Sequence, residues 1–213
     1  MGIYVNPGNE SFRRAVNSKI YVDKTGLLKY TNDVIGTEQR AVCVSRPRRF
    51  GKSMTAGMLA AYYGKGCDSR ELFQQYTIAG VESYEEHLNQ YNVLHLDITD
   101  FYRSGDCPED MLCRINVEVI AELRNIYPGI LKEDENNLPY ALARLNEAAK
   151  AVFVIIIDEW DAIFREYKDD IAAQKEYVKL LRGLFKGEAS KRFAKLVYIT
   201  GILPVKKYGT ESA

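Results

Sequence analysis

The chain has 213 residues, of which 46% are hydrophobic and 27% are charged. These proportions are typical of a globular protein, and they exclude a disordered, collagen-like or coiled-coil chain. Lysine plus arginine and aspartate plus glutamate each number 29, with 13 basic and 12 acidic residues in the first half, 1–106. This balance argues against a protein that binds nucleic acid through a broadly basic surface.

The sequence shows none of the features of a zinc-binding, secreted or membrane protein. Its four cysteines form no C-x-x-C pair, and neither histidine has a second ligand at zinc spacing. The longest apolar run, 151–157, is too short to span a bilayer, and residues 1–10 do not resemble a signal peptide. We therefore expect a cytoplasmic protein, without membrane association, whose cysteines are small buried residues.

Apolar residues at helical spacing alternate along the chain with short apolar runs that predict strands. Helices are predicted for residues 11–18, 52–63, 108–127, 138–150 and 172–185. A further helix is predicted to begin after Asp23, which would be its N-cap, and to carry Leu27 and Leu28. Strands are predicted for residues 41–44, 93–97, 152–157 and 196–199, and residues 77–91 and 132–137 look like connections. The alternation predicts an α/β three-layer sandwich with a parallel sheet, in which ligands bind beyond the carboxyl ends of the strands.

The first predicted strand runs into the loop S-R-P-R-R-F-G-K-S, residues 45–53, which opens a helix. Its last three residues end the phosphate-binding P-loop motif G-x-x-x-x-G-K-S. In that motif Gly51 lets the backbone approach a phosphate, Lys52 reaches the β- and γ-phosphates, and Ser53 binds Mg²⁺. Arg46 replaces the first glycine and Pro47 lacks an N–H donor, so a surface helix start is the other interpretation of the tripeptide.

The third predicted strand is apolar throughout and ends in Asp158, which Glu159 follows. An acid at this position suits a Mg²⁺ ligand, and Glu159 is placed to orient or deprotonate an attacking water. The alternative is that Asp158 caps the next helix, with Glu159 and Asp161 in its first turn. The P-loop-like segment upstream favours the nucleotide site.

The order of strands along the chain adds a third observation. One strand, 93–97, separates the loop strand from the Asp158 strand, and the strand after Asp158 ends in Thr200. The arrangement resembles the additional-strand, catalytic-glutamate division of P-loop ATPases. There Thr200 would contact the γ-phosphate or the attacking water; taken alone, it is an ordinary strand-end threonine.

Five segments in one order then make the resemblance specific: Y-V-D-K-T at 21–25, R-P-R-R-F-G-K-S at 46–53, L-D-I-T at 96–99, I-D-E-W-D at 157–161 and T-G-I at 200–202. Together they resemble the AAA-ATPase-like family of bacterial proteins, from about residue 12 to the end of the chain. Arg46 is typical of that family, and the resemblance implies ATP binding. Family members usually continue into a region like a PD-(D/E)xK nuclease, so we expect a truncated chain or a short member.

Three arginines, Arg46, Arg48 and Arg49, join Lys52 in the loop. We favour contacts with nucleotide phosphates, including the role of an arginine finger from the same chain. Binding of DNA or RNA phosphates and a solvated or acid-paired loop are the other two interpretations.

These observations predict an N-terminal helical extension, residues 1–38, on a P-loop ATPase core, residues 39–213. The expected function is Mg²⁺-dependent ATP binding and hydrolysis that couples the nucleotide state to a protein partner, a second copy of the chain or a C-terminal effector module. The alternatives are a nucleotide-dependent switch with little hydrolysis and a nucleic-acid-associated ATPase, which the net charge does not support. The predicted catalytic residues are Glu159, Lys52 and Thr200, the Mg²⁺ ligands Ser53 and Asp158, and the nucleotide contacts Arg48, Arg49, Phe50, Gly51, Lys52, Ser53 and Met54.

Overall fold

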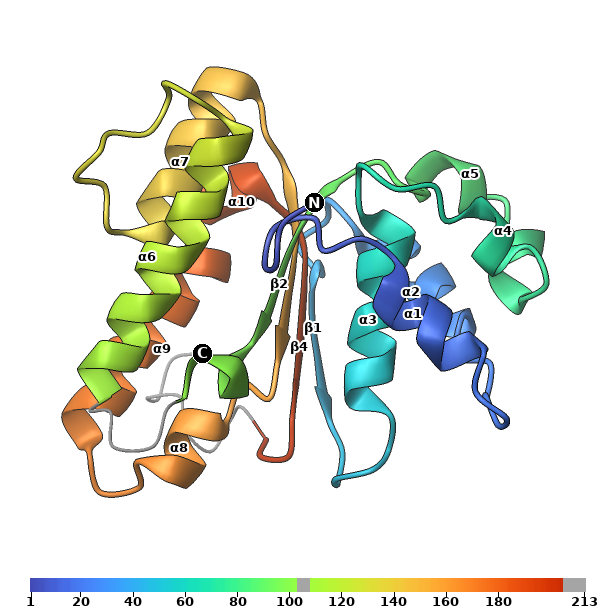
Figure 1. Cartoon of the computed structure of the whole chain (residues 1–213), viewed down its shortest axis with the longest axis horizontal. Helices are drawn as coiled ribbons and strands as arrows, with labels where there is room; N and C mark the ends of the chain where they lie inside the picture. Colours follow the sequence, from blue (N-terminus) through green and yellow to red (C-terminus); the bar gives the residue numbers. More distant parts are fainter. Residues whose placement is uncertain (103–107, 205–213) are drawn as a thin grey trace.

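A sheet of four parallel strands forms the centre of the molecule. The computed structural model describes residues 1–102 and 108–204. The strands lie in the order β1 (Ala41–Ser45), β4 (Ala194–Gly201), β3 (Phe153–Asp158) and β2 (Asn92–Asp97), and each pair of neighbours runs parallel. Helices cover both faces of this sheet (Figure 1). The predicted α/β architecture with a parallel sheet is therefore confirmed.

The inner strand β3 is apolar from Phe153 to Ile157, because both of its faces are covered, and only its last residue, Asp158, is polar. Phe153, Ile155 and Ile157 belong to one hydrophobic cluster, and Val154 and Ile156 belong to another on the opposite face. The first cluster includes side chains of α6 (Pro108–Ile126), α7 (Leu138–Ala149), α9 (Ile171–Phe185) and α10 (Glu188–Phe193). The second includes side chains of α1 (Glu10–Val16), α2 (Gly26–Val34) and α3 (Lys52–Tyr63). A strand covered on both faces favours apolar side chains along its length, so its polar residue stands at its end.

The loop strand β1 differs from β3 because it lies at the edge of the sheet, beside β4 alone. Val42 and Val44 pack against the α3 cluster, whereas Cys43 is exposed. The expectation of buried cysteines is therefore wrong for Cys43 and also for Cys113, which is exposed on α6. Cys107 lies outside the described residues.

Several short helices were not predicted, because they are shorter than the periodicity that reveals a helix. They are α4 (Arg70–Phe73), η1 (Thr77–Gly80), α5 (Tyr84–His87), η2 (Ile98–Phe101), α8 (Ala162–Glu166) and α10 (Glu188–Phe193). Residues 77–91, expected as a connection, thus contain two of them. The N-cap of α2 is Thr25 rather than Asp23. Asp23 lies two residues earlier, where its Oδ1 accepts a hydrogen bond from Thr25 N at 2.7 Å.

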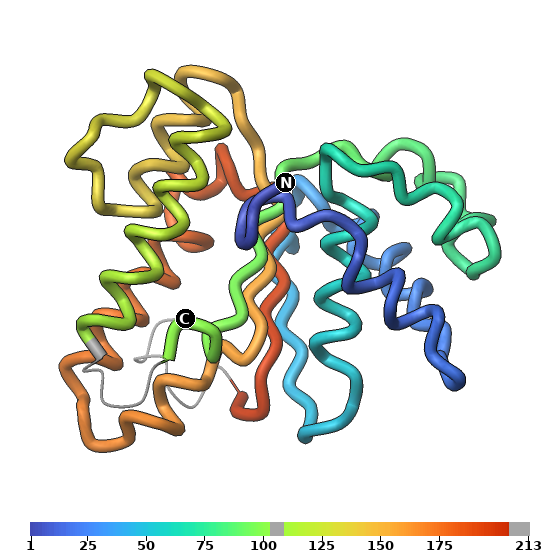
Figure 2. Tube along the Cα trace, viewed as in Figure 1, coloured from blue at the N-terminus to red at the C-terminus, as the bar shows by residue number. Residues whose placement is uncertain are grey.

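The N-terminal segment crosses the sheet edge before it reaches α3. Val5 forms an antiparallel bridge with Leu94 of β2, and the trace in Figure 2 passes from there to α1, which packs on α3. The boundary near residue 38 stays a prediction, and the last part of the predicted core, 205–213, lies outside the described residues. Within the described part of the chain, no helix is both long and apolar enough to cross a membrane.

Asn89 forms hydrogen bonds at the C-terminal end of α3, the helix that begins at Lys52. Its side-chain amide donates hydrogen bonds to Ala61 O at 3.0 Å and Gly64 O at 2.7 Å, and its oxygen accepts one from Ser69 N at 3.0 Å. Its φ of 56° lies in the left-handed region, which asparagine tolerates better than most residues.

We expect Asn89→Ala to lower the free energy of unfolding by about 3 kcal/mol, because three hydrogen bonds are lost and alanine disfavours positive φ. Asn89→Gly is the matched control, since it loses the same bonds without the backbone strain and should cost about 1 kcal/mol less. Urea denaturation measures both. Equal stability of the two variants would show that the backbone conformation does not matter here.

Candidate functional site

The loop between β1 and α3 has the backbone geometry of an anion-binding turn. Two residues, Arg49 (φ 69°) and Gly51 (φ 75°), adopt positive φ just before α3 begins at Lys52. Such turns direct successive N–H groups toward one point, and the start of the helix adds its own positive end. Arg46 N donates to Gly201 O at 3.1 Å, which fixes the start of the loop to the end of β4.

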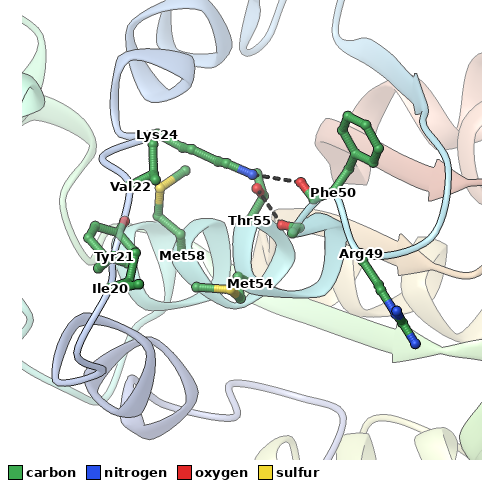
Figure 3. Close-up of a pocket in the computed structure, with 10 residues that line it drawn as sticks. Ile20, Tyr21, Val22, Lys24, Arg49, Phe50, Met54, Thr55 and Met58 are labelled. Atoms are coloured by element: carbon green, nitrogen blue, oxygen red, sulfur yellow. Dashed lines mark hydrogen bonds between the residues drawn. The ribbon is translucent and has the colours of Figure 1, made fainter.

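A lysine from the N-terminal segment fixes the other side of this loop. Lys24 Nζ donates to Phe50 O at 2.7 Å, as Figure 3 shows, while the Phe50 ring points away. The same Nζ lies 2.6 Å from the place that a Cβ on Gly51 would occupy, so the loop passes close to Lys24. From the sequence, Lys24 is interpreted as an exposed lysine, or else as a residue near the base or the phosphates. Its contact with Phe50 was not predicted, because it depends on the tertiary fold.

The carboxyl ends of β3 and β4 are joined through buried polar groups. Asp158, 1% exposed, accepts hydrogen bonds from Thr200 Oγ1 and from Glu159 N. Trp160 N donates to Thr200 O at 3.0 Å. Asp158 therefore does not cap a helix, and its carboxylate is oriented by its neighbours at the end of the strand.

Acidic groups lie together at the carboxyl ends of β2 and β3. Asp97 lies beside Asp158 in the pairing of β2 with β3, and its carboxylate caps η2 by accepting from Thr99 N at 2.9 Å. Burial, together with the negative charges of Asp97 and Asp158, raises the pKa of Asp100. Negative potential at this edge favours a cation.

Glu159 reaches from the acidic side of the site to its basic side. Its Oε1 lies 3.6 Å from Lys52 Nζ, and its Oε2 accepts a hydrogen bond from Arg165 Nη2 at 2.5 Å. Lys52 also donates to Pro47 O at 3.3 Å, and only 7% of the residue is exposed. Glu159 adopts a positive φ of 49°, an unusual conformation that often marks functional residues.

A cavity of about 450 Å³ joins the loop to Glu159. Of the predicted site residues it is lined by Arg48, Arg49, Gly51, Lys52, Ser53, Met54 and Glu159, and it adds Thr99, Arg165 and Glu166. Three predicted residues do not line it: Asp158 and Thr200 are buried, and Phe50, 59% exposed, instead lines a neighbouring cavity. The arrangement can hold an anion between the loop and a positioned carboxylate.

A second cavity, of about 220 Å³, shares Arg49, Gly51 and Met54 with the first. Its wall consists of Ile20, Tyr21, Val22 and Lys24 on one side and Met54, Thr55 and Met58 of α3 on the other (Figure 3). Burial and the nearby Asp23 raise the pKa of Tyr21 to about 12, so its phenol stays neutral. The lining of this cavity is mostly apolar, with Lys24 and Arg49 as its charged residues, whereas charged residues predominate in the first.

Sequence reasoning missed three contributors to these cavities: Arg165, Thr99 and the wall formed by 20–22. Arg165 had a local signal, because it lies four residues after Asp161 on α8. Tyr21 and Val22 belong to the segment 21–25 that carries the family resemblance. Their place in the wall still could not be predicted, because it follows from the packing of α1 and α2 on α3.

Comparison with known proteins agrees with this geometry. The model of the AAA-ATPase-like family, described as predicted AAA-ATPases, matches residues 8–210. The chain belongs to the AAA-ATPase-like family. This membership supports a general nucleotide-binding, ATPase-like role. Neither a curated protein nor a solved structure matches this AAA-ATPase-like chain significantly.

In this AAA-ATPase-like chain, we expect Thr200→Val to lower the free energy of unfolding by about 2–3 kcal/mol, because the buried Asp158 carboxylate loses a donor that is not replaced. Thr200→Ser keeps the hydroxyl and loses only a buried methyl group, so it should cost about 1 kcal/mol. Chemical denaturation compares the two variants. A valine variant as stable as the serine variant would mean that the Thr200–Asp158 contact does not stabilise the fold.

Proposed function

We propose that the protein binds Mg²⁺–ATP at the loop 46–53, hydrolyses it, and couples the nucleotide state to a protein partner or effector module. The observation that carries this proposal is the single cavity that Gly51, Lys52 and Ser53 share with Glu159. A phosphate-binding turn and a carboxylate able to act on water face the same space.

The phosphates would lie against the N–H groups of the loop and the first turn of α3. Lys52 is held inside the cavity, with Glu159 as its partner at 3.6 Å, and a phosphate oxygen would offer it a stronger one. Arg48 and Arg49 line the same cavity and are exposed, so they can approach phosphate oxygens without leaving buried partners.

The oxygens of Ser53 and Asp158 suit Mg²⁺. A hydroxyl and a carboxylate are the hard oxygen donors that this ion prefers, and it usually completes its shell with water and substrate phosphates. Within the described ranges no three histidine, cysteine, aspartate or glutamate side chains form a metal-binding group, so the phosphates would supply much of the coordination. When bound, the ion neutralises charge on the phosphates.

Glu159 is the residue that we assign to the attacking water. It is positioned by the strand end behind it, where its own N–H binds the Asp158 carboxylate at 3.0 Å. The strand β4 lies between the loop strand β1 and the Asp158 strand β3, which supports the additional-strand, catalytic-glutamate division. In this assignment Thr200 acts indirectly, because it is buried and bound to Asp158.

The apolar cavity beside the loop would receive the base and sugar. It is continuous in its lining with the charged cavity, and an ATP molecule is likewise apolar at its base and charged at its phosphates. Tyr21, neutral and flat, and the sulfur-containing side chains of Met54 and Met58 suit contact with an aromatic ring.

A nucleotide-dependent switch with little hydrolysis is the second candidate. The observation in its favour is that both carboxylate oxygens of Glu159 face cations, Lys52 and Arg165. A carboxylate held in this way is a poor base until one partner leaves it.

We expect Lys52→Ala to abolish ATP binding, because the cavity loses its buried cation. Glu159→Gln should keep binding and lose turnover, because an amide cannot accept the proton of water. Calorimetry with Mg²⁺–ATP and phosphate release measure the two effects. Turnover of Glu159→Gln at the wild-type rate would refute the role of Glu159, and turnover too low to detect in the wild type would favour the switch.

Val22→Asp should weaken ATP binding by about tenfold or more, because it brings a charge to the apolar wall that would contact the base. Binding of inorganic triphosphate should change less, because triphosphate has no base. Val117→Asp is the control, because Val117 is also an exposed valine, at 53% against 66% for Val22, and lies on α6. An equal loss of affinity for ATP and for triphosphate would mean that the base does not bind in this cavity.

A further inference from the structure

Arg165, on α8, faces the phosphate loop across the charged cavity. It lines that cavity together with Arg48, Arg49 and Lys52. Its side chain is 17% exposed, so it is mostly enclosed and yet open to the cavity. The motifs that define the proposed ATP site do not include it.

Asp161 holds the inner part of the Arg165 side chain. Asp161 is fully buried, and its Oδ2 accepts hydrogen bonds from Ile202 N at 3.2 Å and Leu203 N at 3.0 Å. The same oxygen lies 3.5 Å from Arg165 Nε. This Nε makes no hydrogen bond within the described part of the chain. The guanidinium is therefore anchored by charge but not saturated with hydrogen bonds.

The outer part of the guanidinium binds Glu159. The 2.5 Å contact of Arg165 Nη2 with Glu159 Oε2 is much shorter than the 3.6 Å contact of Lys52 with Oε1. Glu159 thus bridges two cations of the cavity, one on each wall. In this state the carboxylate occupies the position of an anion between them.

The geometry points to Arg165 as a ligand of the terminal phosphate, supplied by the same chain, which exchanges Glu159 for a phosphate oxygen when ATP binds. This inference rests on the proposed ATP site. A guanidinium binds phosphate through two parallel N–H groups, and Asp161 keeps it at the cavity while its outer N–H groups change partner. No covalent bond changes in this step.

The exchange would tell a triphosphate from a diphosphate. With ATP, the γ-phosphate competes for Arg165 and releases Glu159 to act on water. With ADP, the γ-phosphate is absent and Arg165 keeps its contact with Glu159. The site would therefore bind the triphosphate more tightly than the diphosphate, and Glu159 would be free only when there is a phosphate to remove.

The test compares the affinities of a non-hydrolysable ATP analogue and of ADP, both with Mg²⁺, by calorimetry. Arg165→Ala should lower the affinity for the analogue by about tenfold or more, the effect of losing one charge-assisted hydrogen bond. The affinity for ADP should stay nearly unchanged. Arg165→Lys should restore part of the loss, because it keeps the charge without the two-pronged geometry. Arg192→Ala, which removes an exposed arginine on α10, is the charge-matched control and should change neither affinity.

Each other outcome overturns the inference. An equal loss of affinity for both nucleotides means that Arg165 supports the fold of the site. Unchanged affinities with lower turnover mean that Arg165 acts only by positioning Glu159. If Arg165→Ala does not fold by circular dichroism, Arg165→Lys and Arg165→Gln carry the same comparison. A wild-type protein that binds neither nucleotide refutes the proposed function itself, whereas wild-type binding with no change in discrimination refutes only the role of Arg165.

Discussion

The site depends on one constraint, the parallel arrangement of the four strands. Because they all run in one direction, their carboxyl ends open on the same edge of the sheet, and segments distant in the sequence meet there. The contacts of Arg46 N with Gly201 O and of Trp160 N with Thr200 O fix these ends relative to one another. If β1 or β3 ran in the opposite direction, the loop 46–53 and Glu159 would lie at opposite ends of the sheet and would not share a cavity.

The charges of the site also stabilise the fold before any ligand binds. Lys52 is almost fully enclosed, and burying an ammonium without a partner costs several kcal/mol. Glu159 and the carbonyl of Pro47 compensate part of that cost. A phosphate would compensate it better, because it brings more charge and more acceptor oxygens. In the structure Glu159 is engaged by Lys52 and by Arg165.

The sequence alone predicted most of the architecture, because long helices and buried strands carry periodic signals. It also predicted the loop and Asp158–Glu159, since these lie at strand ends where a motif is local. It did not predict Arg165 or the wall formed by 20–22, whose positions depend on tertiary packing. It placed the helix cap at Asp23 instead of Thr25, because both residues suit a cap and the choice depends on the contact of Asp23 with Thr77.

A chain with zero net charge can still bind a polyanion, because binding depends on the local field and not on the sum. The charged cavity is lined by four cations, Arg48, Arg49, Lys52 and Arg165, against the two carboxylates of Glu159 and Glu166. The acids Asp97, Asp100 and Asp158 lie behind it, at the ends of β2 and β3. An anion with an attached divalent cation can pair with both the cations and the acids. Without the divalent cation, the anion would be repelled by the acids. The division of charge across the site therefore favours a metal-bound phosphate over a free one.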